Sequence, residues 1–175
     1  MPIREILLPE FDQEMAQTRK MLERVPDGRF DFTPHAKSKR IDWLAGHVAD
    51  LPTWIGHTMH TELLAIEPGQ YKAFEPKNNA ELLERFDKNV REAREELSKV
   101  EDDQLKVIWT MQFQGEKVMS MPRYNVLRQV ILNHLIHHRA QLSMYLRMMN
   151  VAVPGMYGPS ADEQGFAKAE TETAA

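Results

Sequence analysis

The amino-acid sequence predicts an all-α protein, a four-helix bundle with a long crossover connection. In four separate segments, apolar residues recur at alternating intervals of three and four, the spacing of one buried helix face. Residues 29–39, between the first two segments, have no such period and are long enough to cross the end of a bundle. With 42% hydrophobic residues, the 175-residue chain can build one core. We expect one domain over residues 1–163 and a disordered tail over residues 164–175, which are small, polar and acidic.

The first two helices are expected within the first 65 residues. The apolar seam of the first helix comprises Phe11, Met15, Thr18, Leu22 and Val25, and the turn residues 26–28 end it. A second helix is expected over residues 41–65, with a seam made by Leu44, Val48, Leu51, Ile55 and Met59. Pro52 lies inside this helix and removes one backbone hydrogen bond, but the seam continues in phase beyond it. We therefore expect a kink near residues 49–51 rather than a break.

The other two helices follow a change of period. Asn78 and Glu81 resemble the capping box that begins a helix, and the third seam comprises Leu83, Phe86, Val90, Ala93, Leu97 and Val100. Residues 108–116 resemble a small β-hairpin or an irregular excursion. The fourth helix is expected between Pro122 and Asn150, with a seam made by Leu127, Ile131, His134, His138, Gln141 and Tyr145. Residues 151–157 are expected to pack over the end of the bundle.

Composition excludes several classes of function. The formal net charge is −4, so the chain has no surplus of positive charge for a nucleic-acid backbone. It contains no cysteine, so any bound metal must be held by nitrogen and oxygen ligands. No apolar run reaches the roughly 18 to 20 residues of a membrane span, and the N-terminus lacks the apolar core of a signal peptide. We therefore expect a cytoplasmic protein without a membrane or nucleic-acid partner.

Helix phase separates the seven histidines. His134 and His138 lie on one seam at positions i and i+4, where two imidazoles can converge on one metal ion. His47 lies between seam positions of the second helix and is the natural third ligand, whereas His57 and His60 are rotated away from it. The residues alone leave open that the pair only forms hydrogen bonds within the core. They also leave open the roles of His35 and His137.

Three neutral histidines would leave a divalent ion its full charge and open positions for a substrate, which is typical of a catalytic site. Residue 135 is leucine, so the glutamate of the HExxH metalloproteases is missing. Asp50 is the candidate proton acceptor, one turn beyond His47, and Gln141 could donate to a group at the metal. A structural role is the alternative for both. Trp43 and Trp54 flank His47 and either wall a pocket or serve ordinary packing.

At these residues the sequence resembles the DinB/YfiT-like family of metal-binding proteins. The matching stretches are WLAGHVAD at residues 43–50, NHLIHHRAQL at residues 133–142 and VPGMYGPS at residues 153–160. The resemblance implies a metal site at His47, His134 and His138, because the family takes one histidine from the second helix and two from the HxxxH of the last long helix. It also implies a homodimer and a divalent ion, with zinc or nickel ahead of iron or manganese.

The family includes transferases and isomerases that use low-molecular-weight thiols, so the resemblance implies a small-molecule substrate and a thiol partner. The leading hypothesis is S-transfer, in which the ion lowers the pKa of a thiol so that the thiolate attacks an electrophile. The chain has no cysteine of its own, which is consistent with a thiol supplied from outside. One alternative is metal-dependent hydrolysis of a small ester or amide. Another is a non-catalytic metal or ligand binder in a stress response.

Overall fold

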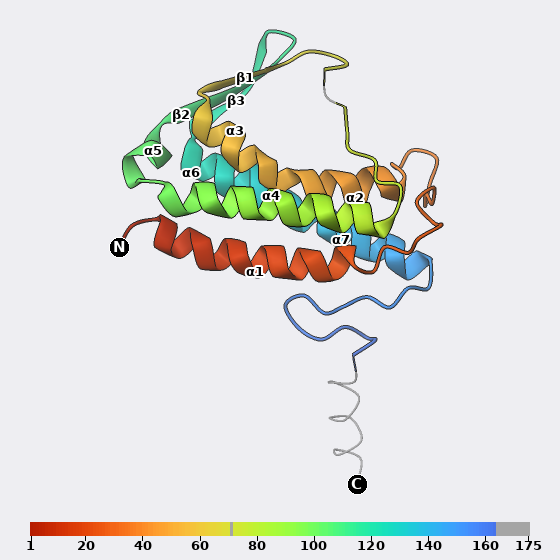
Figure 1. Cartoon of the computed structure of the whole chain (residues 1–175). Helices are drawn as coiled ribbons and strands as arrows, with labels where there is room; N and C mark the ends of the chain where they lie inside the picture. The colour runs from red at the N-terminus through yellow and green to blue at the C-terminus, as the bar shows by residue number, and fades with distance from the viewer. Residues whose placement is uncertain (71, 164–175) are drawn as a thin grey trace, which may run out of the picture.

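The computed structural model describes residues 1–70 and 72–163, in which helices and short strands alternate (Figure 1). The α-helices are α1 (Arg4–Leu22), α2 (Ile41–Asp50), α3 (Trp54–His60), α4 (Asn79–Lys99), α5 (Asp102–Lys106), α6 (Arg123–Asn125) and α7 (Asn133–Met148). A 3₁₀ segment, Leu51–Thr53, joins α2 to α3, and a π-helical segment, Val126–Leu132, joins α6 to α7. One sheet contains the strands β1 (Leu63–Ile66), β2 (Ile108–Phe113) and β3 (Glu116–Pro122).

The long helices enclose one apolar core. Helix α1 packs against α4 and α7, and α2 packs against the same two helices (Figure 1). The core includes Leu7, Phe11, Leu22, Ile41, Leu51, Leu82, Phe86, Leu97, Leu135 and Leu142, each at most 3% exposed. No helix in the described part of the chain combines the length and apolar composition of a bilayer span.

The three-stranded sheet shows that the all-α, four-helix-bundle prediction is wrong, because the fold is mixed α/β. Residues 63–65, expected to end the second helix, instead belong to β1 (Leu63–Ile66), which pairs in parallel with β2. The chain leaves α3 at Thr61, whose backbone is extended (φ −129°, ψ 163°). A short apolar run is compatible with either a helix or a strand, and the partner of β1 lies far along the sequence. Helical phase alone could therefore not identify this strand.

The predicted hairpin is confirmed as β2 and β3. Gln114 and Gly115 form its turn and both have positive φ, 53° and 79°, a geometry that matches the twist of antiparallel strands. Trp109 attaches the sheet to the helices. Its side chain is completely buried, and its Nε1–H donates to Oγ1 of Thr61 at 3.1 Å.

Two predicted features of the helix ends are present. Helix α4 begins at Asn78, whose side chain accepts a hydrogen bond from the Glu81 backbone N–H at 2.8 Å. The Glu81 carboxylate accepts from the Lys77 backbone at 2.9 Å, so the capping box is displaced by one residue. Pro52 lies in the 3₁₀ segment between α2 and α3, at the predicted kink.

The fourth predicted helix is present but changes its pitch. The π-helical segment Val126–Leu132 carries more residues per turn than an α-helix and so shifts the phase of everything after it. As a result the buried residues of α7 are Leu135, Arg139, Leu142 and Leu146, one position later than the predicted seam. His134 and His138 are half-buried at the margin of the core, beside α2, rather than at its centre.

The segment after α7 packs against the core through Val151, Val153 and Met156, as predicted. Its Tyr157 hydroxyl reaches a buried ion pair between Glu14 of α1 and Arg139 of α7. The predicted tail, residues 164–175, lies outside the described residues, so the domain boundary at residue 163 stays a prediction.

Candidate metal centre

Three histidines from two helices bring their Nε2 atoms together. The Nε2 of His47 on α2 lies 3.5 Å from that of His134 on α7, and the latter lies 2.7 Å from the Nε2 of His138. One ligand atom from each residue lies within 4.8 Å of the others, so the group could hold a metal ion. All three rings are half-buried. The predicted cluster is therefore present, formed by the residues that helix phase selected.

Close packing fixes helix α2 beside this cluster. The ring of Trp43 stacks on that of His47, with centroids 5.0 Å apart and planes 14° from parallel. On another face of α2, Gly46 leaves room for the chain around Phe74: a Cβ at residue 46 would meet the Phe74 carbonyl oxygen at 1.8 Å. Trp43 thus packs directly against the His47 ring, which fits both alternatives predicted for it, and glycine is required at residue 46.

Hydrogen bonds orient the two histidines of α7. The Nδ1 of His138 lies 2.7 Å from Oε1 of Gln141, an atom that only accepts, so Nδ1 carries the proton. The backbone of Val130 favours the protonated form of His134, which opposes the effect of burial on its pKa. His138 therefore directs an unprotonated Nε2 towards Nε2 of His134. Such outer partners commonly orient histidines that bind metals.

His47 differs from its two neighbours. Its Nδ1 is buried and has no hydrogen-bond partner among the described residues, so the Trp43 stack is what holds the ring.

Burial keeps the three imidazoles neutral. Burial, and to a smaller extent the charges of the nearby His138 and His134, lower the pKa of His47 from 6.5 to about 4. Burial also lowers the pKa of His134 and of His138, although the bonds to Val130 and Gln141 oppose this shift. Near pH 7 a metal ion would therefore have no proton to displace from these nitrogens.

The donor set fits a divalent cation. The Nε2 atoms of His134 and His138 lie 2.7 Å apart, close enough for one ring to donate a hydrogen bond to the other or for both to bind one cation. Two nitrogens that share a tetrahedral zinc ion lie about 3.3 Å apart, given bond lengths of roughly 2.0 to 2.1 Å. The separation of 3.5 Å between His47 and His134 is close to this value. The pair on α7 would have to separate by roughly 0.6 Å, which is within reach of small side-chain rotations.

Three other residues considered from the sequence, Asp50, Trp54 and His137, lie outside the histidine cluster. Oδ1 of Asp50 accepts hydrogen bonds from Nε of Arg85 at 2.8 Å and from Nδ2 of Asn89 at 3.2 Å, both on α4, so its predicted proton-acceptor role stays a prediction. Trp54 lines a separate cavity with Asp50. The ring of His137 lies 5.0 Å from that of His138 but is outside the group that could hold a metal.

The other histidines are exposed. Nδ1 of His35 accepts from the Lys37 backbone, and Nε2 of His60 lies 3.0 Å from Oε2 of Glu96. His57 and His60 face α4 across a cavity, away from the cluster, as the helix phase predicted.

Sequence reasoning missed the buried ion pair that fixes the rotation of α7. Nη2 of Arg139 lies 2.7 Å from Oε2 of Glu14, and Nη1 donates to Oγ1 of Thr18 at 3.1 Å. The side chains of Arg139 and Glu14 are 2% and 7% exposed. In an unbroken α-helix Arg139 would point away from the predicted seam, and the π-helical segment brings it inward. Because Arg139 follows His138 directly, this pair holds the histidines toward α2.

Comparisons with known proteins agree with the fold and identify a family. The DinB family model matches residues 4–172. Among curated proteins, the uncharacterized protein YrdA of Bacillus subtilis strain 168 is 33% identical over 63 residues, which are 34% of this chain and 37% of that protein. The match thus spans little more than a third of the relative. It does not show the activity or the partners of this chain.

Two solved structures share the fold. A DinB-like protein from Bacillus cereus ATCC 10987 has a TM-score of 0.67 and 21% identity, covering 86% of this chain and 95% of that one. The DinB-like protein YjoA from Bacillus subtilis has a TM-score of 0.64 and 15% identity, covering 85% and 96%. The family match covers nearly the whole sequence, including all three histidines. The chain belongs to the DinB family.

Proposed function

We propose that this protein binds one divalent metal ion through Nε2 of His47, His134 and His138 and uses it for S-transfer from a low-molecular-weight thiol. The observation that supports the metal proposal is the distance between these atoms. Nε2 of His134 lies 2.7 Å from that of His138 and 3.5 Å from that of His47, and burial lowers the pKa of the rings. Three nitrogen ligands leave coordination positions open, which favours catalysis over a purely structural role. Imidazole ligands suit zinc and nickel, which are the ions we propose.

When bound, the ion would lower the pKa of a thiol beside it and so increase the thiolate fraction at neutral pH. The S–H bond would lose its proton to solvent or base, the sulfur would form a bond to the electrophilic carbon, and the leaving group would depart with its electron pair. The chain's own residues contribute position. Gln141 orients the His138 ring, and Trp43 forms an apolar wall beside His47 that limits access of water.

The metal proposal is tested by elemental analysis of protein purified without a histidine tag. The wild type, loaded with zinc or nickel and then desalted, should retain about one ion per chain, whereas a His134→Ala, His138→Ala variant should retain almost none. A His57→Ala, His60→Ala variant is the matched control, because it also removes two neighbouring helical histidines but leaves the cluster intact. Equal retention by the wild type and the His134→Ala, His138→Ala variant would disprove the site.

The reaction is tested with the zinc-loaded protein and a chromogenic alkyl or aryl halide, with glutathione, cysteine and bacillithiol as the thiols. Turnover should require a thiol and should disappear in the His134→Ala, His138→Ala variant. Turnover of an ester or amide substrate that is unchanged when thiol is added would instead establish the hydrolase alternative. Metal retention without turnover of either substrate type would favour a non-catalytic binder. Gel filtration of the same preparation tests the homodimer, which stays a prediction.

A further inference from the structure

We propose a second ligand site, for a small carboxylate with a flat apolar body, in a cavity between the helices and the sheet. The cavity has a volume of about 320 Å³, within the lower range of small-molecule pockets. It is lined by α2 and α3, by β1, by the chain just after β1 and by α4, and none of the three clustered histidines lines it. Asp50 and Trp54, which are not members of the histidine cluster, meet in this cavity.

The walls of the cavity are largely apolar. Trp54 is the first residue of α3, and Leu64 and Ile66 are alternate residues of β1. Ala65 between them also lines the cavity, so β1 contributes three consecutive apolar residues, of which Leu64 and Ile66 are half-buried. With the indole of Trp54 in the same lining, these side chains favour a flat apolar ligand.

A fixed guanidinium group supplies the polar contact. Arg85 of α4 uses Nε to donate to Oδ1 of Asp50, and Asp50 is itself held by the buried Asn89. The guanidinium carbon lies 5.4 Å from the ring centroid of Phe74, which supports the group from one side. Within residues 1–70 and 72–163, no hydrogen bond engages the two terminal nitrogens of Arg85. These nitrogens form the fork that binds a carboxylate through two parallel hydrogen bonds.

The net charge of the residues that line the cavity favours a ligand with one negative charge. Lys72 and Arg85 each carry a positive charge and Asp50 a negative one, so their sum is +1. Lys72 is exposed at the mouth of the cavity and can approach a ligand that Arg85 holds. One carboxylate would neutralise this charge, whereas a phosphate dianion would exceed it. An aromatic monocarboxylate thus matches both the apolar walls and the charge.

The test is a titration with 2-naphthoate, followed by backbone ¹H–¹⁵N NMR spectra, with the neutral analogue 2-naphthylmethanol in parallel. We expect shifts of the amides of Trp54, Leu64, Ile66 and Arg85. The affinity for the carboxylate should be at least about fivefold higher than for the alcohol, because charge-assisted hydrogen bonds are the stronger ones. Shifts confined to other surfaces, or none at 5 mM 2-naphthoate, would overturn the proposal.

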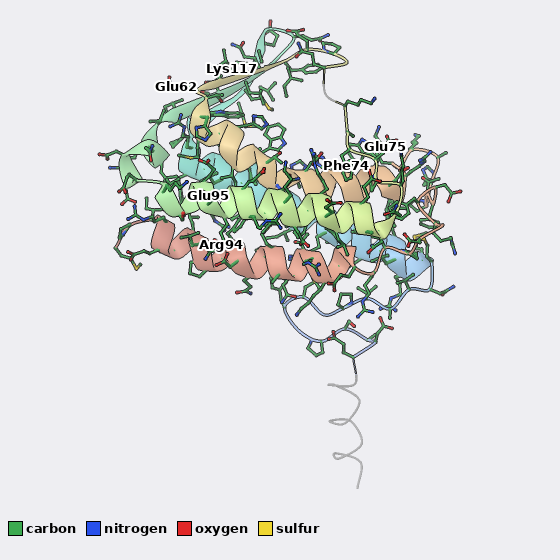
Figure 2. All side chains as sticks on the ribbon, viewed as in Figure 1. Glu62, Phe74, Glu75, Arg94, Glu95 and Lys117 are labelled. Atoms are coloured by element: carbon green, nitrogen blue, oxygen red, sulfur yellow. The ribbon has the colours of Figure 1, made fainter. Side chains whose placement is uncertain are left out.

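Variants locate the contact. Arg85→Gln should raise the dissociation constant of 2-naphthoate about tenfold or more and leave that of the alcohol within about twofold. Arg94→Gln is the matched control, because Arg94 is also on α4 and also pairs through Nε with an aspartate, Asp12 of α1, outside the cavity (Figure 2). An equal effect of both variants would overturn the assignment.

Two further variants keep the outcome decisive. If Arg85→Gln does not fold, Lys72→Gln replaces it, because Lys72 is exposed, and should weaken carboxylate binding about threefold. The His134→Ala, His138→Ala variant should bind 2-naphthoate as the wild type does. Loss of binding in that variant would place the ligand at the histidine cluster and would overturn the second site.

Discussion

The buried pair Glu14–Arg139 allows a quantitative prediction about stability. Replacement of Glu14 by glutamine keeps the size of the side chain but removes its charge and puts an amide NH₂ where a carboxylate oxygen accepts hydrogen bonds. Oε2 of Glu14 lies 2.7 Å from Nη2 of Arg139 and 2.9 Å from the Tyr157 hydroxyl, so the variant would leave one acceptor oxygen where the carboxylate has two. Arg139, whose side chain is 2% exposed, would retain its charge without a counter-ion.

Breaking one partner of a buried ion pair costs about 3 to 5 kcal/mol. Because Thr18 and the Glu14 backbone carbonyl continue to accept from Arg139, we expect the lower end, about 3 kcal/mol. For a domain of this size, about 2 to 4 °C per kcal/mol gives a fall in Tm of roughly 6 to 12 °C. Urea unfolding followed by circular dichroism at 222 nm measures the free energy, and thermal scans measure Tm.

The matched control is Glu10→Gln on the same helix. Glu10 pairs with Arg128, and these side chains are 34% and 31% exposed, so the loss should not exceed about 1 kcal/mol. A double Glu14→Leu, Arg139→Met variant should be less destabilised than Glu14→Gln, because it leaves no uncompensated charge. If Glu14→Gln unfolds within 1 kcal/mol of the wild type, or no more easily than Glu10→Gln, the buried pair does not have the strength assigned to it.

Three further predictions concern the surroundings of the site. The folded-state pKa of His47, about 4, lies below its ordinary value of 6.5. As the pH decreases from 6.5 towards 4, the unfolded state therefore binds a proton at His47 before the folded state does. The free energy of unfolding of the metal-free protein should fall over this range. In urea unfolding at several pH values, His47→Ala should weaken the dependence of the unfolding free energy on pH. If this dependence is the same as in the wild type, the prediction is wrong. Gln141→Leu should lower zinc affinity about 10- to 100-fold in competition with a chelator, and unchanged affinity would remove the orienting role of Gln141. Gly46→Ala should cost roughly 1 to 3 kcal/mol, because its Cβ would meet the Phe74 carbonyl at 1.8 Å, whereas Gly56→Ala, with open space around its Cβ, should be neutral or slightly stabilising. Equal unfolding free energies for these two glycine variants would count against the close packing at Gly46.

The metal cluster could be predicted because its information is local. The interval of four residues between His134 and His138, and the phase of His47 in its helix, survive the kink at Pro52 and the π-helical segment. Both disturbances act at segment ends and leave these short intervals unchanged.

Features that depend on distant partners could not be predicted. Strand β1 exists because Leu63–Ile66 pairs with β2, and an apolar run of four residues carries no sign of that partner. Asp50 shares a helix with His47, but its direction is set by Arg85 and Asn89 on another helix. The burial of Arg139 requires the altered pitch before α7, which local propensity does not reveal.

The π-helical segment Val126–Leu132 makes the site sensitive to the pitch of the helix that precedes it. If the same seven residues formed an ordinary α-helix, α7 would turn by about 100° relative to the chain before it. His134 and His138 would then leave α2, although every ligand remained in the sequence. The pitch of this segment is therefore as much a part of the metal centre as the histidines are.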